Sequence, residues 1–212
     1  MYDELYLALE LADGDPQTKL IVFTGNGRYF TSGNDQNNIT DPESMDRRNA
    51  FRKLVDILIE IKKPLIALVN GPAVGMGVTM LVHFDLVFAS DTATFSTPFT
   101  NLGLCAEGTS SYMFPRIMGY SKAAEMLMFN RKFSAQELLG CGFVSRVFPH
   151  SLFEAQSKAL IKEYAQLGSR ALVEGKALIR YKEFRETLHR VNERESRVLD
   201  DLYTSPEAME AS

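Results

Sequence analysis

The chain has 212 residues, of which 45% are hydrophobic and 24% are charged, and its formal net charge is −4. This length fits one domain or two small ones, and the hydrophobic share is ample for a single core. The acidic balance gives no basic footprint for nucleic acid, so we expect no nucleic-acid partner. The two cysteines, Cys105 and Cys141, are too few for a disulfide framework and favour a reducing compartment.

One apolar stretch is long enough to be considered as a membrane span. Residues 64–84 contain no Asp, Glu, Lys or Arg, and about 20 such residues can cross a bilayer. Asn70-Gly71-Pro72 divides this stretch, and Gly75 and Gly77 follow closely. We therefore favour a buried strand followed by a buried helix and expect no membrane span. We also expect neither a signal peptide nor a C-terminal targeting signal.

The first part of the chain alternates between helix and strand. Residues 2–11 predict a helix, and the Asp-Gly-Asp-Pro sequence of residues 13–16 predicts a turn. Residues 19–24 predict a strand, and Gly25-Asn26-Gly27 is typical of a hairpin or tight turn. After a polar loop, residues 44–61 predict an amphipathic helix, because their apolar side chains recur at i, i+3, i+4 and i+7.

The central part of the chain carries the residues that suggest chemistry. A strand predicted over 64–69 is followed by the glycine turn 70–77, a helix, and a second strand over 86–89. A glycine turn that opens a helix presents free backbone N–H groups, which can stabilise a negative oxygen. The loop 102–108 then supplies the carboxylate of Glu107. Together these features predict an acid–base site.

The remaining elements are short at first and then wholly helical. The sequence predicts a strand over 94–96, helices over 109–119 and 121–129, a capped helix from 134–137, a last strand over 143–148, and two or three helices over 151–203. In the last helix, we interpret an apolar stripe as a packing face that could contact a partner subunit; it consists of Leu188, Val191, Val198, Leu199 and Leu202. We expect an α/β fold with a core over 1–150 and a helical part of the same domain over 151–212.

Several short motifs are specific together, although each alone is weak. They are Phe30-Thr31-Ser32-Gly33-Asn34-Asp35, the nine residues from Val69 to Gly77, Phe84-Asp85, Ala93-Thr94-Phe95, and the segment 142–149. They resemble the crotonase (enoyl-CoA hydratase/isomerase) superfamily over nearly the whole chain. This resemblance implies a crotonase-like spiral of ββα units with C-terminal trimerisation helices, and hence a homotrimer. The first strands of that family usually precede a helix like the one at Met1, so we expect N-terminal strands to be missing.

The resemblance also implies an oxyanion hole, in which two backbone N–H groups hold the negative oxygen of an enolate. By position these groups belong to Asn34 and Met76. The neighbouring glycines fit this role, because a side chain beside the N–H groups would block the approach of a thioester carbonyl. The implied substrate-binding residues are Ser32, Gly33, Asn34, Asp35, Gln36, Gly75, Met76, Phe99 and Leu104.

Glu107 distinguishes between branches of this superfamily. The hydratases that the sequence resembles use two glutamates, and Thr79 and Phe99 stand at their positions here. Water addition by that pair is therefore not expected. The loop around Glu107 is similar to the one that supplies the single catalytic glutamate of the peroxisomal-type Δ3-Δ2-enoyl-CoA isomerases. These enzymes shift a double bond of an acyl-CoA thioester from position 3 to position 2 during the β-oxidation of unsaturated fatty acids.

A base that removes a proton from carbon is expected to lie in an apolar pocket. Candidates for the pocket wall are Phe95, Phe99, Leu102 and Leu104. Burial among these side chains should raise the pKa of the Glu107 carboxyl, because an apolar environment disfavours the charged form.

Other interpretations of these residues stay open. A lone Glu in a loop is usually solvated, although the matching loop and the two absent hydratase glutamates favour catalysis. Cys105 has no His close by, so a nucleophile is not expected, and the three histidines show no metal-ligand spacing. We expect no cofactor, because coenzyme A is part of the substrate.

Two functional alternatives to the isomerase remain. One is a catalytically silent crotonase-like domain, similar to the chromodomain Y-like corepressors, which would bind acyl-CoA or a protein partner. The other is a different enolate reaction, such as thioester hydrolysis or hydration with a different base. The family resemblance implies a peroxisome or a mitochondrion as the compartment.

Overall fold

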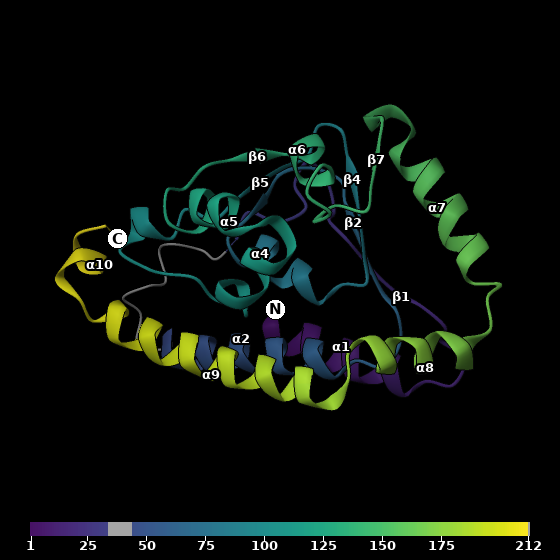
Figure 1. Cartoon of the computed structure of the whole chain (residues 1–212), viewed down its shortest axis with the longest axis horizontal. Coiled ribbons are helices and arrows are strands. Elements are labelled where there is room, and N and C mark those ends of the chain that lie inside the picture. The colour runs from purple at the N-terminus through teal and green to yellow at the C-terminus, as the bar shows by residue number, and fades with distance from the viewer. Residues whose placement is uncertain (34–43, 212) are drawn as a thin grey trace.

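The computed structural model describes residues 1–33 and 44–211, and Figure 1 shows an α/β arrangement with a sheet covered by helices. The strands are β1 Ile21–Thr24, β2 Leu65–Val69, β3 Ala73–Val74, β4 Leu86–Ser90, β5 Thr94–Ser96, β6 Phe133–Ser134 and β7 Arg146–Phe148. The main sheet has the order β1-β2-β4-β7, and all its pairs are parallel. A smaller sheet has the order β3-β5-β6, with β5 and β6 antiparallel.

The helices cover the main sheet and continue to the C-terminal end. They are α1 Tyr2–Gly14, α2 Ser44–Glu60, α3 Met76–Thr79, α4 Ser110–Met118, α5 Tyr120–Leu127, α6 Ala135–Leu139, α7 Phe153–Tyr164, α8 Ser169–Ile179, α9 Lys182–Tyr203 and α10 Pro206–Glu210. The described residues also form the 3-10 turns η2 Met80–His83, η3 Thr100–Leu102 and η4 His150–Leu152. In Figure 1, α9 runs beside α2 along one side of the molecule, and the two helices pack on each other. Within the described ranges, none of the helices is long and apolar enough to cross a bilayer.

The central strand β2 explains how the core is divided. All of its residues are buried, and successive side chains of a strand point to opposite faces of the sheet. Ala67 and Val69 accordingly belong to the large core cluster, whereas Ile66 and Leu68 belong to a second cluster. Phe153 of α7 joins that second cluster, so α7 covers one face of the sheet.

The parallel pairing of β1 and β2 brings together the two segments that follow them. The N–H of Gly25, just after β1, donates to Oδ1 of Asn70, just after β2, at 3.1 Å. Thr31 then pairs with Ala73 in an isolated parallel bridge. Two motifs far apart in the sequence, around residues 31–33 and 73–77, are therefore neighbours in space.

Most of the predicted elements are confirmed. The amphipathic helix at 44–61 is α2, and the strands at 64–69 and 94–96 are β2 and β5. The capping box at the start of α6 is complete: the Glu137 N–H donates to Ser134 Oγ at 3.2 Å, and the Ser134 N–H donates to Glu137 Oε2 at 2.9 Å.

Several boundaries and pairings are wrong. Asp13 and Gly14 are the last residues of α1, not part of a turn, and β1 runs parallel to β2, so the glycines after it close no hairpin. The last strand begins at Arg146, because the N–H groups of Phe143 and Val144 donate to the Leu138 carbonyl and close a turn after α6.

The apolar stripe of α9 also differs from the prediction. Leu188, Val191 and Leu199 are buried, but Val198 is 46% exposed. Glu195, not Val198, occupies the central position of the stripe, since it lies four residues from both Val191 and Leu199. The buried face of α9 therefore contains a carboxylate.

A buried ion pair ties α8 to the main sheet. Lys176 of α8 is 7% exposed, and its Nζ donates to Asp85 Oδ2 at 2.7 Å and to the Lys63 carbonyl at 2.8 Å. The same Asp85 oxygen accepts the N–H of Leu65, the first residue of β2, at 2.7 Å. Asp85 therefore connects the start of the sheet with α8.

We expect Lys176→Met to lower the free energy of unfolding by roughly 2–3 kcal/mol, because it leaves the Asp85 carboxylate without its cation. The loss falls below the usual range for a buried pair because the Asp85 side chain is 27% exposed. Lys182→Met removes a lysine from an exposed i, i+4 pair on α9 and should change stability by less than about 0.5 kcal/mol. Urea unfolding of both variants tests this, and equal losses would contradict a structural role for the buried pair.

Candidate active site

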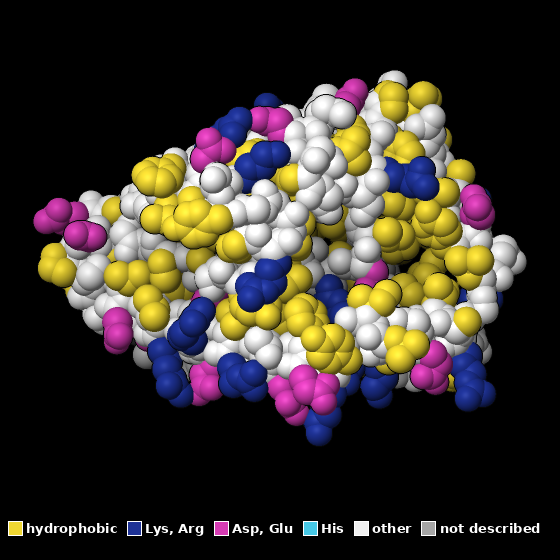
Figure 2. Space-filling model, in the orientation of Figure 1, with side chains coloured by type: hydrophobic (Ala, Val, Ile, Leu, Met, Phe, Trp, Pro, Cys, Tyr) yellow, Lys and Arg dark blue, Asp and Glu magenta, His cyan; other side chains and the backbone are white. Residues whose placement is uncertain are grey.

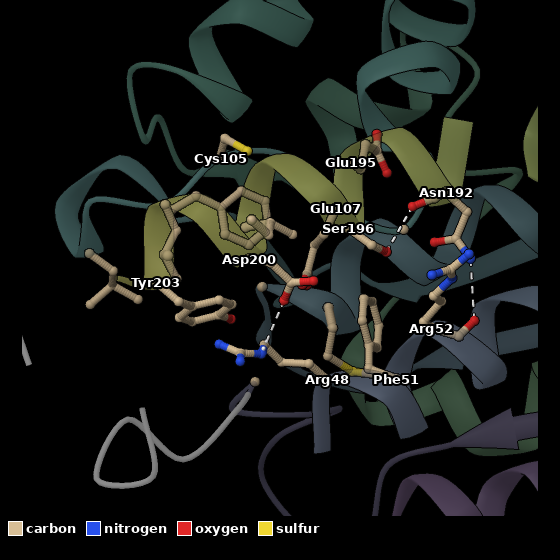
Figure 3. A pocket seen from close by; sticks show the side chains of 18 of the residues that line it. Arg48, Phe51, Arg52, Cys105, Glu107, Asn192, Glu195, Ser196, Asp200 and Tyr203 are labelled. Carbon is tan, nitrogen blue, oxygen red and sulfur yellow. Dashed lines mark hydrogen bonds and ion pairs between the residues drawn. The ribbon is translucent and has the colours of Figure 1, made fainter. Parts of the chain in front are cut away.

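A cavity of about 170 Å³ lies between α2, α9 and the loops that follow β1, β2 and β5. Figure 3 shows its wall, with Phe51 from α2 on one side and Glu195, Ser196 and Tyr203 from α9 on the other. Seven of the predicted site residues line it: Ser32, Gly33, Gly75, Met76, Phe99, Leu104 and Glu107. The other three, Asn34, Asp35 and Gln36, lie outside the described residues.

The turn before α3 leaves backbone donors available at the cavity. Gly75 has φ 58°, a conformation that favours glycine, and its N–H donates to the Ser96 carbonyl at 2.9 Å. The N–H groups of Met76 and Gly77 donate to no acceptor within residues 1–33 and 44–211. Met76, the predicted donor, thus lines the cavity with an N–H that donates to no described residue.

The neighbouring segment packs very closely on this turn. A Cβ atom at Gly77 would lie 1.9 Å from Cγ2 of Thr31. The carbonyl of Thr31 accepts the N–H of Val74 at 3.2 Å, and its Oγ1 accepts the N–H of Gly33 at 3.1 Å. The absence of a side chain at residue 77 is therefore what lets segment 31–33 lie against the start of α3.

Glu107 is buried in the cavity wall. It is 6% exposed, and no described residue donates a hydrogen bond to its carboxylate. Burial, and then the charge of Glu195, raise the pKa of its carboxyl to about 8. The expectation of a raised pKa is confirmed.

The apolar wall of the cavity matches the prediction with one exception. Phe99, Leu102 and Leu104 line the cavity, and Phe51, which was not predicted, also lines it. Phe95 does not, since it is fully buried behind the site and its ring packs edge-on against Phe143 at 6.4 Å between centroids. A strand residue alternates its facing with its neighbours, and β5 turns Phe95 into the core.

The backbone after Glu107 is unusual. Gly108 and Thr109 both have positive φ, at 64° and 69°, and a β-branched residue rarely adopts this region. His83 Nε2 lies 3.1 Å from the Gly108 carbonyl and 3.2 Å from Thr109 Oγ1. Burial lowers the pKa of His83 to about 3, so the ring is neutral and donates from Nε2 to the carbonyl.

The position expected for one hydratase glutamate lies beneath this loop. Thr79 is fully buried, and a Cβ at Gly108 would lie 3.0 Å from its Oγ1. Phe99, at the second position, contributes apolar surface to the cavity. Neither position supplies a carboxylate.

Residues near the two ends of the chain also contribute to the cavity, which was not predicted. Tyr2 and Tyr203 line the cavity, and burial followed by the charge of Glu107 raises the pKa of both phenols, that of Tyr203 to about 12. Burial also raises the pKa of the Cys105 thiol to about 11, which makes it a poor nucleophile. Only Glu195 left a signal that could have been used, because it is a charged residue on the apolar stripe of α9.

Polar side chains of α2 and α9 also line the cavity. Arg48 Nε lies 3.3 Å from Asp200 Oδ1, and its guanidinium lies 4.7 Å from the centre of the Tyr203 ring. Figure 3 shows these three side chains together. Among the described residues, no group of three or more His, Cys, Asp or Glu side chains is placed to hold a metal ion.

Comparisons with known proteins agree with these features. A family model described as enoyl-CoA hydratase/isomerase matches residues 1–211. The rat protein named enoyl-CoA delta isomerase 2 is 46% identical over all of this chain and 55% of its own length. The human chromodomain Y-like protein is 39% identical over 98% of this chain and 36% of its own length. The structure of Pseudomonas aeruginosa OdaA is 36% identical, with a TM-score of 0.93 over 100% of this chain and 85% of that one. The chain spans about half, or less, of the length of these curated relatives.

Proposed function

The chain belongs to the enoyl-CoA hydratase/isomerase family, and from this premise we propose that it is a Δ3-Δ2-enoyl-CoA isomerase. Its substrate would be an acyl-CoA thioester with a double bond at position 3, formed during the β-oxidation of unsaturated fatty acids. The observation that carries the proposal is the carboxyl of Glu107, which is buried in the wall of the cavity that Met76 also lines and whose pKa is raised to about 8.

One carboxylate is sufficient for this reaction. Glu107 removes the proton from C2, and the electron pair of that C–H bond moves toward the thioester carbonyl to give a dienolate. The same carboxylic acid returns the proton at C4, which leaves the double bond between C2 and C3. The coenzyme A moiety is part of the substrate, and no further cofactor is needed.

The proposed roles of the surrounding residues follow from the charge that develops. The dienolate oxygen would accept hydrogen bonds from the N–H groups of Met76 and Asn34, and removing one such donor typically slows a reaction by about 100- to 1,000-fold. The role of Asn34 rests on the family resemblance alone. Ser32, Gly33 and Gly75 would form the backbone around the thioester, and Phe99 and Leu104 would contact the acyl chain.

The raised pKa of Glu107 suits this task. A carboxylate with a pKa near 8 is a stronger base toward a carbon acid than an exposed glutamate, and a general base works best when its pKa is close to the working pH. Thr79 and Phe99 stand at the positions of the two hydratase glutamates, and neither supplies a carboxylate, which disfavours hydration by that pair.

The proposal is tested by supplying trans-3-hexenoyl-CoA and following formation of the trans-2 isomer. Parallel incubation with trans-2-hexenoyl-CoA, with analysis for the 3-hydroxy product, detects hydration. Isomer formation without hydration supports the proposal. Tight binding of the acyl-CoA by calorimetry without either reaction would instead favour the silent binding domain, the second candidate raised by the similarity to the chromodomain Y-like protein.

We also propose that the chain assembles as a homotrimer through its C-terminal helices. The end of α8 exposes large apolar side chains, with Leu178 80% and Ile179 77% exposed. Figure 2 shows apolar side chains gathered around a hollow in the region of α7 and α8. Solvent-exposed apolar patches of this kind commonly mark an interface.

We expect the double substitution Leu178→Glu, Ile179→Glu to convert the trimer into a monomer, because charged side chains at this patch would prevent its burial between subunits. Phe129→Glu is the matched control, because Phe129 is 73% exposed at the end of α5, away from α8. Light scattering after size-exclusion chromatography decides the matter. A wild-type chain that is already monomeric would contradict the proposed assembly.

The compartment is proposed from the same family relationship. A chain that acts on unsaturated acyl-CoA thioesters is expected in a peroxisome or a mitochondrion, where β-oxidation takes place. Fluorescence microscopy of the full-length protein, with markers for both organelles, tests this expectation.

A further inference from the structure

We propose that Glu195 of α9 is a positioning residue, which holds the loop carrying Glu107 in place and sets the pH range in which Glu107 acts as a base. This inference rests on the proposed isomerase function. Figure 3 shows both glutamates at the cavity, with Glu195 on the ribbon of α9 and Glu107 below it.

Glu195 holds the loop after Glu107 through two hydrogen bonds. Its Oε2 accepts the N–H of Thr109 at 2.6 Å, and its Oε1 accepts the N–H of Ser111 at 2.9 Å. These N–H groups lie at the start of α4, where backbone donors have no partner within the helix. Hydrogen bonds to an ionised carboxylate are stronger than neutral ones. Glu195 is 5% exposed. It thus caps the N-terminal end of α4, although it lies in a distant part of the sequence.

The backbone of Gly108 and Thr109, which Glu195 holds, is strained. Thr109 has φ 69°, directly after Gly108 with φ 64°, and such backbone persists only where surrounding contacts hold it. The contacts here are His83 on one side and Glu195 on the other. Because Glu107 directly precedes this segment, its placement in the cavity depends on the same contacts.

The carboxylates of Glu107 and Glu195 differ in the hydrogen bonds that they accept. Burial raises the pKa of both, but the side chain of Ser111, the N–H groups of Ser111 and Thr109, and the charge of Arg194 act against the rise at Glu195. Glu107 receives no such hydrogen bond from any described residue, and the charge of Glu195 is the second cause of its raised pKa, after burial. The hydrogen bonds that Glu195 accepts therefore favour its charged form, whereas the surroundings of Glu107 favour its neutral form.

The other titratable groups around Glu107 do not replace this effect. Tyr2 from α1, Tyr203 from α9 and Cys105 from the preceding loop have raised pKa values and are uncharged at neutral pH. His83, from η2, is neutral because burial lowers its pKa to about 3.

Three further charged side chains line the cavity. Arg48 of α2 pairs with Asp200 of α9, and Arg52 of α2 lines the same region. None of these three is a cause of the raised pKa of Glu107, whereas Glu195 is. Substitution of Glu195 alone should therefore move the titration of Glu107.

The test is the pH dependence of kcat/KM for isomerisation in wild type and Glu195→Gln. Gln keeps the size and removes the charge, so the acidic limb should move to lower pH by roughly one unit. We expect kcat to fall about tenfold with a smaller change in KM, because the base becomes weaker and its loop looser. Glu193→Gln is the matched control on the same helix, where the side chain is 43% exposed and pairs with Arg197.

A second variant separates charge from shape. Glu195→Asp keeps the negative charge but is too short to reach both N–H groups in the same way. Its acidic limb should stay near that of wild type while kcat falls. If Glu195→Gln lowers the melting temperature and kcat but leaves the acidic limb unmoved, the residue is merely structural and the proposal is overturned. If Glu195→Gln does not fold, a displaced limb in Glu195→Asp would overturn it.

A direct titration keeps this inference separate from the proposed function. Protein labelled with carboxyl-¹³C glutamate is titrated by NMR, and the Glu107 signal is assigned with Glu107→Gln. A lower pKa of Glu107 in Glu195→Gln supports the coupling even if the wild type shows no isomerase activity, in which case only the proposed function fails. An unchanged Glu107 titration in an active enzyme would overturn the inference and leave the proposed function intact.

Discussion

Replacing Glu107 with Gln is expected to lower kcat for isomerisation by at least about 100-fold, with little change in KM. Gln keeps the size and polarity of the side chain but cannot accept the C2 proton, and loss of a general base usually costs this much or more. Because the carboxylate contributes to proton transfer and not to holding the thioester, kcat should carry the effect. The measurement is steady-state conversion of trans-3-hexenoyl-CoA.

The control for this variant is again Glu193→Gln, an exposed residue of α9 in which the same chemical change should leave kcat unaltered. Equal activity of wild type and Glu107→Gln would place the base elsewhere. Absence of activity in both, with acyl-CoA still bound, would favour the silent binding domain.

The same variant has an expected effect on stability with a defined sign. The pKa of Glu107 is raised from 4.5 to about 8 in the folded chain, so between these pH values the folded state holds a proton that the unfolded state has lost. The free energy of unfolding of the wild type should therefore fall as pH rises through this window. Glu107→Gln has no such carboxyl, and above pH 8 it should be more stable than wild type, by an amount on the order of a few kcal/mol.

Urea unfolding at pH 5 and pH 9 tests this linkage. The difference between Glu107→Gln and wild type should be larger at pH 9 than at pH 5. A difference that is equal at both values would mean that Glu107 is solvated in the folded chain and that its pKa is not raised.

Local sequence patterns predicted the elements that depend on local interactions. The capping box of Ser134 and Glu137 requires residues three positions apart, and the apolar period of α2 is visible in the sequence alone. The glycine turn before Met76 was also predicted, because the conformation of Gly75 at φ 58° is one that other residues rarely adopt.

The features that the sequence analysis missed depend on tertiary contacts. β3 is only two residues long, Ala73–Val74, and exists because Thr31 and β5 lie on either side of it. Tyr2 and Tyr203 reach the cavity from opposite ends of the chain, and no spacing in the sequence relates them to Glu107. The resemblance to a known family supplied the role of Glu107, but not the helix that covers it.

The unusual position of Glu195 is visible in the sequence, although it was not predicted as a site residue. A Glu between Val191 and Leu199 interrupts an apolar stripe, and a charged residue at such a position must be paired or hydrogen-bonded if it is buried. Its partners, the N–H groups of Thr109 and Ser111, could not be identified from the sequence, because they belong to the backbone of a distant segment.

The second large effect is expected for Gly77→Ala. A Cβ at this position would lie 1.9 Å from Cγ2 of Thr31, far inside van der Waals contact. Thr31 cannot rotate away freely, because its Oγ1 accepts the N–H of Gly33 at 3.1 Å. The variant should therefore push segment 31–33 away from Met76. Overpacking of this kind costs roughly 1–3 kcal/mol of stability, and separating the two proposed oxyanion donors should lower kcat by about 100-fold or more.

Because the clash is with the Cγ2 atom of Thr31, a second substitution at Thr31 should relieve it. Thr31→Ser removes the Cγ2 methyl group but keeps the hydroxyl that accepts from Gly33, so by itself it should have only a small effect. Combined with Gly77→Ala, it should restore most of the stability and of kcat, and the double-mutant cycle should show a favourable coupling of about 1 kcal/mol or more. Urea unfolding and the isomerase assay on all four proteins provide the numbers. Additive losses in the double variant would contradict the prediction, because they would show that residue 77 does not pack against the methyl group of Thr31.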